Sequence, residues 1–115
     1  MRRSACIERL DPVCSNLFTR LLNYELQKRG LVVFQQLGVP VQYEGVKLDL
    51  GFRVDLLVGK KVVIEIKSVE ALAPVHRKQV LTYLRLMDLR LGLLINFNVE
   101  LIKDGIQRVV NRLAE

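Results

Sequence analysis

Hydrophobic positions along this chain follow two periods, and each period predicts one type of element. Residues 13–29, "VCSNLFTRLLNYELQKR", repeat apolar side chains every three or four positions, which predicts an amphipathic helix that ends at Gly30. A second helix is expected from Pro74, a residue that suits a first helical turn, to about Asp88. Shorter runs rich in branched aliphatic residues predict strands. These strand runs are 31–37, 41–58 with a tight turn at Glu44 and Gly45 and a bend at Gly51, 61–69, 91–97 and 106–110.

The predicted order of elements, α-β-β-β-β-α-β-β, indicates an α/β fold of the α+β type, in which helices pack on a mixed sheet. A helix that connects the strands 61–69 and 91–97 makes this pair parallel, because a crossover connection returns the chain in the same direction. The 115 residues contain no repeat, low-complexity tract or linker. We therefore expect one domain over residues 1–115.

Composition narrows the class of protein. Eighteen basic and twelve acidic side chains give a net charge of +6, which favours a polyanionic partner, although charge alone is a weak pointer. The first ten residues lack the apolar segment of a signal peptide, and no run approaches the ~20 apolar residues of a membrane span, so we expect a cytoplasmic protein without a membrane partner. Cys6 and Cys14, with a single His in the chain, suggest neither a zinc site nor a disulfide framework.

The stretch from residue 54 to 70, "VDLLVGKKVVIEIKSVE", has the composition of a buried hairpin but contains two carboxylates and an ammonium group. If residues 59–61 form the loop, the residue numbers of each facing pair add up to 120, so Asp55 lies opposite Glu65. Lys67 then shares their face of the sheet, because side chains alternate along a strand. A two-residue loop would instead turn Asp55 toward the aliphatic face, which is a poor solution.

Two carboxylates that face each other across a strand pair destabilise the fold unless something offsets their repulsion. A magnesium or manganese ion is a natural candidate, since these ions prefer carboxylate oxygens, water and substrate phosphate. Such an ion activates water and neutralises charge on a phosphodiester, while a nearby lysine stabilises the transition state. The alternative is an ordinary surface ion pair between Lys67 and Asp55 or Glu65, and this motif alone does not decide between the two.

The second predicted helix carries three polar side chains inside an otherwise apolar arc. His76, Gln79 and Tyr83 fall within about 60° of one another at 100° per residue. Polar groups in such an arc need partners, so we interpret them as part of one polar pocket with Lys67. The alternative is a histidine satisfied in the core and a tyrosine that packs its ring and exposes its hydroxyl.

Together these residues resemble the GxxExxR family of small bacterial proteins, a branch of the PD-(D/E)XK nuclease-like superfamily. The similarity extends from about Asn23 to "INFN" and "DGIQRVV", roughly four fifths of the chain. Its most specific parts are Arg53-x-Asp55, Glu65-Ile66-Lys67 and His76-x-x-Gln79-x-x-x-Tyr83, the last containing the QxxxY pattern of exonuclease branches.

The resemblance implies a restriction-endonuclease-like core and a divalent-metal-dependent nuclease, with Mg²⁺ or Mn²⁺ as cofactor and DNA favoured over RNA as substrate. It implies that Asp55, Glu65 and the backbone carbonyl of Ile66 bind the metal and that Lys67 is the catalytic lysine. Auxiliary or substrate-contacting roles would belong to Arg53, His76, Gln79 and Tyr83.

Residues 1–22 depart from the family pattern. Members carry a glutamate-rich first helix, whereas this chain has Ser15, Thr19 and Arg20 at the corresponding positions. Glu25 is present a turn and a half further along, where it could also be a surface residue beside Lys28 and Arg29.

Three functions of different classes therefore remain open. The first is a metal-dependent nuclease, and the second is a nucleic-acid-binding or regulatory module with weakened catalysis. The third is a small scaffold or interaction protein in which the charged residues only pair with one another.

Overall fold

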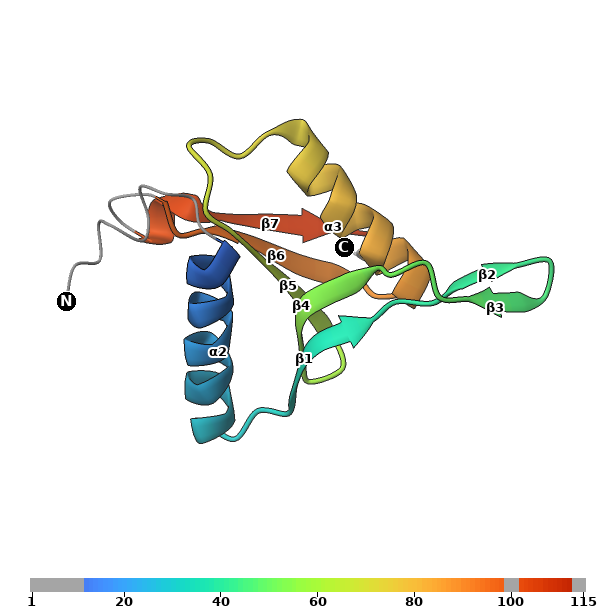
Figure 1. Cartoon of the computed structure of the whole chain (residues 1–115), viewed down its shortest axis with the longest axis horizontal. Helices are drawn as coiled ribbons and strands as arrows, with labels where there is room; N and C mark the ends of the chain where they lie inside the picture. The colour runs from blue at the N-terminus through green and yellow to red at the C-terminus, as the bar shows by residue number, and fades with distance from the viewer. Residues whose placement is uncertain (1–11, 99–101, 113–115) are drawn as a thin grey trace.

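The computed structural model describes residues 12–98 and 102–112, and it shows a mixed α/β fold (Figure 1). The secondary structure elements of the described residues, in chain order, are α2 (Pro12–Lys28), β1 (Val33–Gly38), β2 (Val41–Tyr43), β3 (Val46–Leu48), β4 (Arg53–Val58), β5 (Val62–Lys67), α3 (Pro74–Met87), β6 (Leu91–Asn96), the 3₁₀ turn η1 (Ile102–Gly105) and β7 (Ile106–Val110).

The main sheet has five strands in the order β1-β4-β5-β6-β7. Strands β5 and β6 are parallel, with α3 as their crossover helix, and the other neighbouring pairs are antiparallel. This arrangement confirms the predicted mixed sheet and its parallel pair. It also puts the predicted site strands, β4 and β5, in the interior of the sheet.

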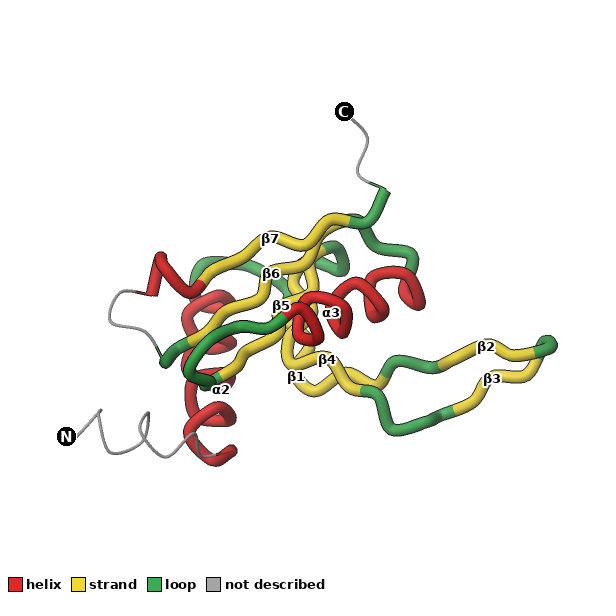
Figure 2. Tube along the Cα trace, turned by 90° about the horizontal axis from the view of Figure 1, so that it is seen from above, coloured by secondary structure: helices red, strands yellow, loops and turns green. Residues whose placement is uncertain are grey.

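Helices α2 and α3 cover opposite faces of the sheet (Figure 2). On one face, Val63 packs with Val80 and Leu84 of α3. On the other, Ile64 packs in a cluster that includes Phe18 and Leu22 of α2. Consecutive residues of β5 therefore enter different halves of the core, as the alternation of side chains along a strand requires.

The predicted run 46–58 is two strands rather than one bent strand. Gly51 adopts a φ of +83°, and the Asp49 carboxylate accepts a hydrogen bond from its N–H at 3.0 Å. This local turn ends β3 before β4 begins, so five strands, not four, precede α3. Strands β2 and β3 form a sheet of their own that projects from the body of the molecule (Figures 1 and 2).

Some sequence-based expectations concern positions outside the described structure. They include Cys6 and the side chains of Cys14 and Ser15. No helix among the described residues is long and apolar enough to cross a membrane.

Gly92 of β6 allows α3 to pack closely on the sheet. A Cβ at this position would lie 2.6 Å from Val80 Cγ1, well inside carbon–carbon contact distance, and Val80 is fully buried. Substitution Gly92→Ala therefore forces the helix and sheet apart. We expect it to lower the free energy of unfolding by about 1–3 kcal/mol, measured by urea denaturation.

Gly38→Ala is the matched control for this prediction. A Cβ at Gly38 would meet only the guanidinium end of Arg53, which is exposed and can rotate away. The control should lose less than about 1 kcal/mol. Equal losses in the two variants would contradict the packing argument.

Candidate active site

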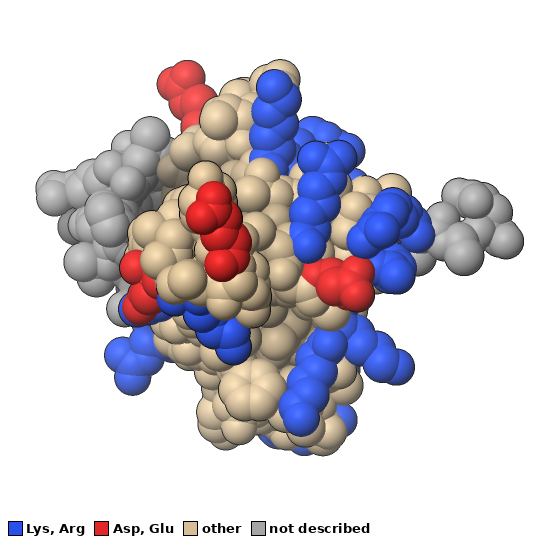
Figure 3. Space-filling view, turned by 90° about the vertical axis from the view of Figure 1, so that its right-hand side faces the viewer, with Lys and Arg blue, Asp and Glu red and all other residues tan. Residues whose placement is uncertain are grey.

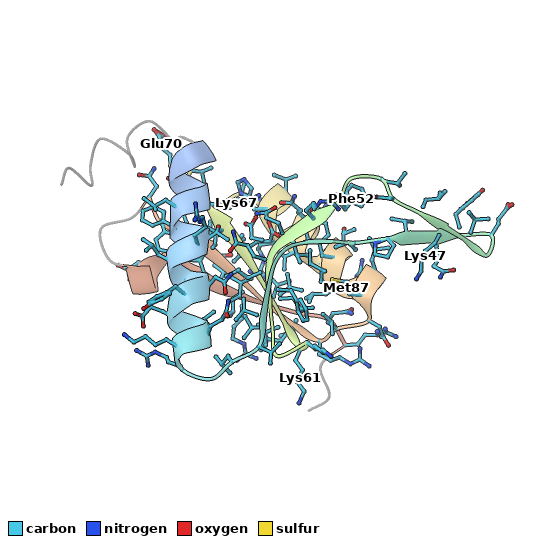
Figure 4. All side chains as sticks on the ribbon, turned by 60° about the horizontal axis from the view of Figure 1, so that its bottom comes forward. Lys47, Phe52, Lys61, Lys67, Glu70 and Met87 are labelled. Atoms are coloured by element: carbon cyan, nitrogen blue, oxygen red, sulfur yellow. The ribbon has the colours of Figure 1, made fainter. Side chains whose placement is uncertain are left out.

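The β4–β5 hairpin has the register that the aliphatic pattern predicts. The paired residues are Leu56↔Ile64, Leu57↔Val63 and Val58↔Val62, each summing to 120. Asp55 and Glu65 come one step beyond the last of these pairs. In Figure 4, Lys61 of the hairpin loop and Lys67 lie at opposite ends of this strand pair, so the charged residues gather at the end away from the loop.

At this end, the two carboxylates hydrogen-bond the backbone of the facing strand. The N–H of Asp55 donates to Glu65 Oε1 at 3.0 Å, and the N–H of Ile66 donates to Asp55 Oδ2 at 2.8 Å. Side-chain oxygens thus accept the hydrogen bonds where the regular ladder has stopped. These reciprocal bonds hold both carboxylates in place and direct them into the same space.

Burial and mutual repulsion make it hard to ionise both acids in the metal-free protein. Glu65 is 3% exposed and Asp55 is half-buried. Burial, followed by the charge of Asp55, raises the pKa of Glu65 from 4.5 to about 8. The ammonium of Lys67, 3.9 Å from Glu65 Oε2, offsets only part of this shift. Glu65 therefore retains a proton at neutral pH in the metal-free protein.

Lys67 is connected to α3 through a chain of hydrogen bonds. Its Nζ donates to Gln79 Oε1 at 2.9 Å, and Gln79 Nε2 donates to the Tyr83 hydroxyl at 3.1 Å. Burial raises the pKa of Tyr83 above 10, so its hydroxyl stays neutral and keeps a proton to donate. The structure thus brings together Lys67, Gln79 and Tyr83, three of the four residues of the predicted polar pocket, whereas His76 bonds elsewhere.

His76 and Arg53 occupy more peripheral positions. His76 Nδ1 accepts a hydrogen bond from the Ala73 N–H at 2.8 Å, so this side chain caps the start of α3. Arg53 is exposed, and its guanidinium lies over Gly38 of the neighbouring strand. Neither side chain takes part in the hydrogen bonds described above for the two carboxylates.

The donor atoms at the carboxylate pair fit a hard divalent cation. Both acids supply oxygen, and their repulsion favours a positive ion between them. Ile66 directs its N–H toward Asp55, and because the N–H and C=O of a strand residue point the same way, its carbonyl faces the same side. A Mg²⁺ or Mn²⁺ site at this position would therefore have two carboxylates and one backbone oxygen from the chain.

A third acidic ligand is missing from the part of the chain that the structure describes. No group of three His, Cys, Asp or Glu side chains suited to a metal occurs there. On α2, Thr19 is only 2% exposed and Arg20 is exposed. Glu25 is an exposed residue that pairs with Lys28 and Arg29 at 3.9 and 3.8 Å, which agrees with its interpretation as a surface residue.

Asn96, which was not predicted as a site residue, has a buried amide that fixes the backbone following Lys67. Its Oδ1 accepts the Val69 N–H at 3.1 Å, its Nδ2 donates to the Val69 carbonyl at 2.9 Å, and the residue is 2% exposed. The next N–H, of Phe97, donates to the Lys67 carbonyl at 2.9 Å. The only signal in the sequence was a polar residue at the end of an apolar strand.

Gln36 is a second residue that the sequence did not single out. It lies opposite Asp55 in the β1–β4 register, and its Nε2 donates to Asp55 Oδ1 at 3.2 Å. Its φ of +54° is unusual for a residue other than glycine and interrupts the regular pairing at this position. Strained backbone of this kind is common at functional sites.

The raised pKa of Glu65 predicts how the stability of the metal-free protein depends on pH. Between pH 4.5 and about 8, folded Glu65 keeps a proton that the unfolded chain has lost. The contribution of Glu65 to the free energy of unfolding is therefore fully present below pH 4.5 and is lost as the pH rises to about 8. With a chelator present, Glu65→Gln should melt about 5 °C or more above the wild type at pH 8 and approach it at pH 5.

Because both proteins share every other titrating group, the difference between their melting curves isolates Glu65. Two curves that remain parallel from pH 5 to 8 would contradict the proposed burial of this acid.

Comparison with known proteins agrees with this geometry. The family model described as the PD-(D/E)XK nuclease superfamily matches residues 12–109, which include both helices and both site strands. No curated protein and no solved structure matches the chain significantly. The match covers most of the sequence, and its name describes the acid, acid and lysine that meet at the end of β4 and β5. The chain belongs to the PD-(D/E)XK nuclease superfamily.

Proposed function

We propose that this protein is a divalent-metal-dependent nuclease that hydrolyses phosphodiester bonds, with DNA as the favoured substrate. The observation that carries the proposal is that Glu65 accepts a hydrogen bond from the Asp55 N–H and Asp55 accepts one from the Ile66 N–H, with Lys67 Nζ 3.9 Å from Glu65 Oε2. A surface ion pair would be solvated and flexible, whereas these carboxylates are held by backbone N–H groups, and one of them is buried.

In this proposal Asp55, Glu65 and the Ile66 carbonyl hold Mg²⁺ or Mn²⁺. When bound, the ion activates water and neutralises charge on the phosphate. Glu65 loses its proton on binding, because a metal ligand must be ionised. Asp55 keeps its orientation through the N–H of Ile66 and the amide of Gln36.

Lys67 contributes positive charge beside the carboxylates, where the reacting phosphate would lie. Gln79 Oε1 accepts a hydrogen bond from the Lys67 ammonium and so directs Nζ, while the neutral Tyr83 hydroxyl keeps its own proton and can donate a hydrogen bond to the nucleic acid strand. His76 and Arg53 would act on substrate from the rim. The preference for DNA rests on the resemblance to exonuclease branches of the superfamily.

A nucleic-acid-binding module with weakened catalysis is the second candidate. It is favoured by the absence of a third acid near the carboxylate pair among the described residues. An acid placed at Thr19 would be buried, so the first helix does not offer an obvious replacement there. The fold and the net positive charge are compatible with both candidate functions. The two functions differ in whether the protein cleaves the nucleic acid that it binds.

The first test is the thermal effect of the ion. Magnesium or manganese at about 100 times its dissociation constant should raise the melting temperature by on the order of 10 °C, because the unfolded chain cannot assemble the site. Asp55→Asn should remove this rise, whereas Glu25→Gln, a change in an exposed carboxylate outside the site, should leave it intact. An equal rise in all three proteins would rule out the proposed ligands.

The second test is cleavage of single- and double-stranded DNA with magnesium, manganese or chelator. Lys67→Ala should reduce cleavage by about 10²–10³-fold while the melting shift with metal remains, since the lysine supplies charge rather than a ligand. DNA binding and a metal shift without cleavage in the wild type would favour the binding module. Activity that is insensitive to chelator and to these substitutions would count against the proposal.

A further inference from the structure

In the part of the chain that the structure describes, β2 and β3 pack mainly against each other, and their sheet forms an arm. Residues 41–50, here called the arm, leave the body between β1 and β4 and extend away from it (Figures 1 and 2). Almost every residue in the two strands is exposed. An isolated two-stranded hairpin is marginally stable in water, so an arm of this kind gains most from a surface that covers it.

One face of the arm is apolar. The register pairs Tyr43 with Val46 and Val41 with Leu48, which places these four side chains on the same face, while Gln42 and Lys47 occupy the other. Tyr43 is 64% and Val46 57% exposed, values that are high for neighbouring large apolar side chains. Exposed apolar residues gathered on one face are typical of an interaction surface.

The charge of the arm argues against nucleic acid as its partner. It carries one lysine and two acids, although the whole chain has a net charge of +6. In the view along the arm, acidic side chains lie near the centre of this end of the molecule, and Lys and Arg side chains lie mainly to the right and below (Figure 3). Glu44 and Gly45 form the turn at the tip of the arm, with φ of +51° and +79°. The carboxylate of Glu44 therefore lies at the end of the arm.

A surface of complementary character lies between α2 and β1. It is an open depression of about 490 Å³, lined by Arg20, Asn23, Tyr24, Gln27, Lys28 and Gln35. Leu17, Leu21 and Tyr24 continue it as an exposed apolar stripe at helical spacing. In the described part of the chain, the Arg20 guanidinium has no acid within ion-pair distance.

The arm cannot reach this depression in its own chain. Both ribbon views place α2 and the arm at opposite ends of the longest axis, which spans 49 Å, and the arm points away from α2 (Figures 1 and 2). The arm can, however, reach the same depression on a second copy of the chain. Two copies related by a two-fold axis can make the contact twice and so form a closed pair.

We propose that the arm of one copy docks in the α2–β1 depression of a second copy, with Tyr43 against the apolar stripe and Glu44 beside Arg20. The contact matches apolar surface with apolar surface, and it brings together Glu44 and Arg20, neither of which has an ion-pair partner among the described residues. None of Asp55, Glu65 and Lys67 lines the depression or belongs to the arm, so the proposal does not rest on the proposed nuclease activity.

The test measures self-association of the full chain by sedimentation over a wide concentration range. The wild type should form a dimer. Glu44→Lys and Arg20→Glu should each raise the dissociation constant at least about tenfold, because like charges then meet. The double variant should restore most of the affinity, since it exchanges the two charges. Tyr43→Ser should weaken the dimer about thirtyfold, as the loss of an aromatic anchor does.

Asp104→Lys makes the same charge change as Glu44→Lys at an exposed position outside both surfaces, and it should leave the dimer unchanged. Melting temperatures equal to the wild type would show that the variants are folded. A chain that is monomeric at every concentration would overturn the proposal. The proposal would also be overturned if Glu44→Lys left the dissociation constant of the dimer unchanged. The same holds if the double variant lost as much affinity as the two single variants lose together. A Glu44→Lys variant that binds DNA more tightly while self-association stays constant would assign the arm to nucleic acid instead.

Discussion

Two carboxylates that approach each other where a β-ladder stops are the constraint on which this molecule depends. Asp55 and Glu65 each accept the N–H of the opposite strand, so the oxygens that would repel one another are also the ones that satisfy the local backbone. Removing either acid would relieve repulsion and leave a buried N–H without its acceptor. The arrangement is therefore costly in the metal-free protein but locally well defined, which is what a preorganised cation site requires.

The remainder of the fold keeps this costly pair in position. Alternate residues of β5 enter the cores under α2 and α3, so the strand cannot slip in register without exposing one set and burying the other. Gly92 lets α3 approach closely enough for Gln79 to bond Lys67. Asn96 fixes the chain directly after that lysine. Each of these contacts lies outside the carboxylate pair, and each limits the freedom of a group beside it.

Much of this arrangement could be predicted from the sequence because it follows from periodicity. The aliphatic alternation of the hairpin allows one good register, and that register determines the meeting of Asp55 and Glu65. The spacing of Gln79 and Tyr83 likewise placed them on the side of α3 that faces Lys67. The roles of Asn96 and Gln36 depend on hydrogen bonds between segments far apart in the chain, which no local pattern reports. The sequence predicted a bend at Gly51 rather than the turn that separates β3 from β4, because a glycine is compatible with either a curved strand or a turn.

The raised pKa of Glu65 connects the stability of the protein with its proposed chemistry. A cation that binds the pair must displace a proton from Glu65 at neutral pH, so part of its binding free energy is used to ionise that acid. With two acidic side chains rather than three in the part of the chain that the structure describes, the proposed site has less negative charge to offset this cost. Lys67, held near Glu65 by Gln79, lowers the cost slightly but also repels the ion. At the proposed metal site, affinity would therefore depend on the balance between the second carboxylate and the lysine, and it would rise with pH until Glu65 is ionised in the metal-free protein as well.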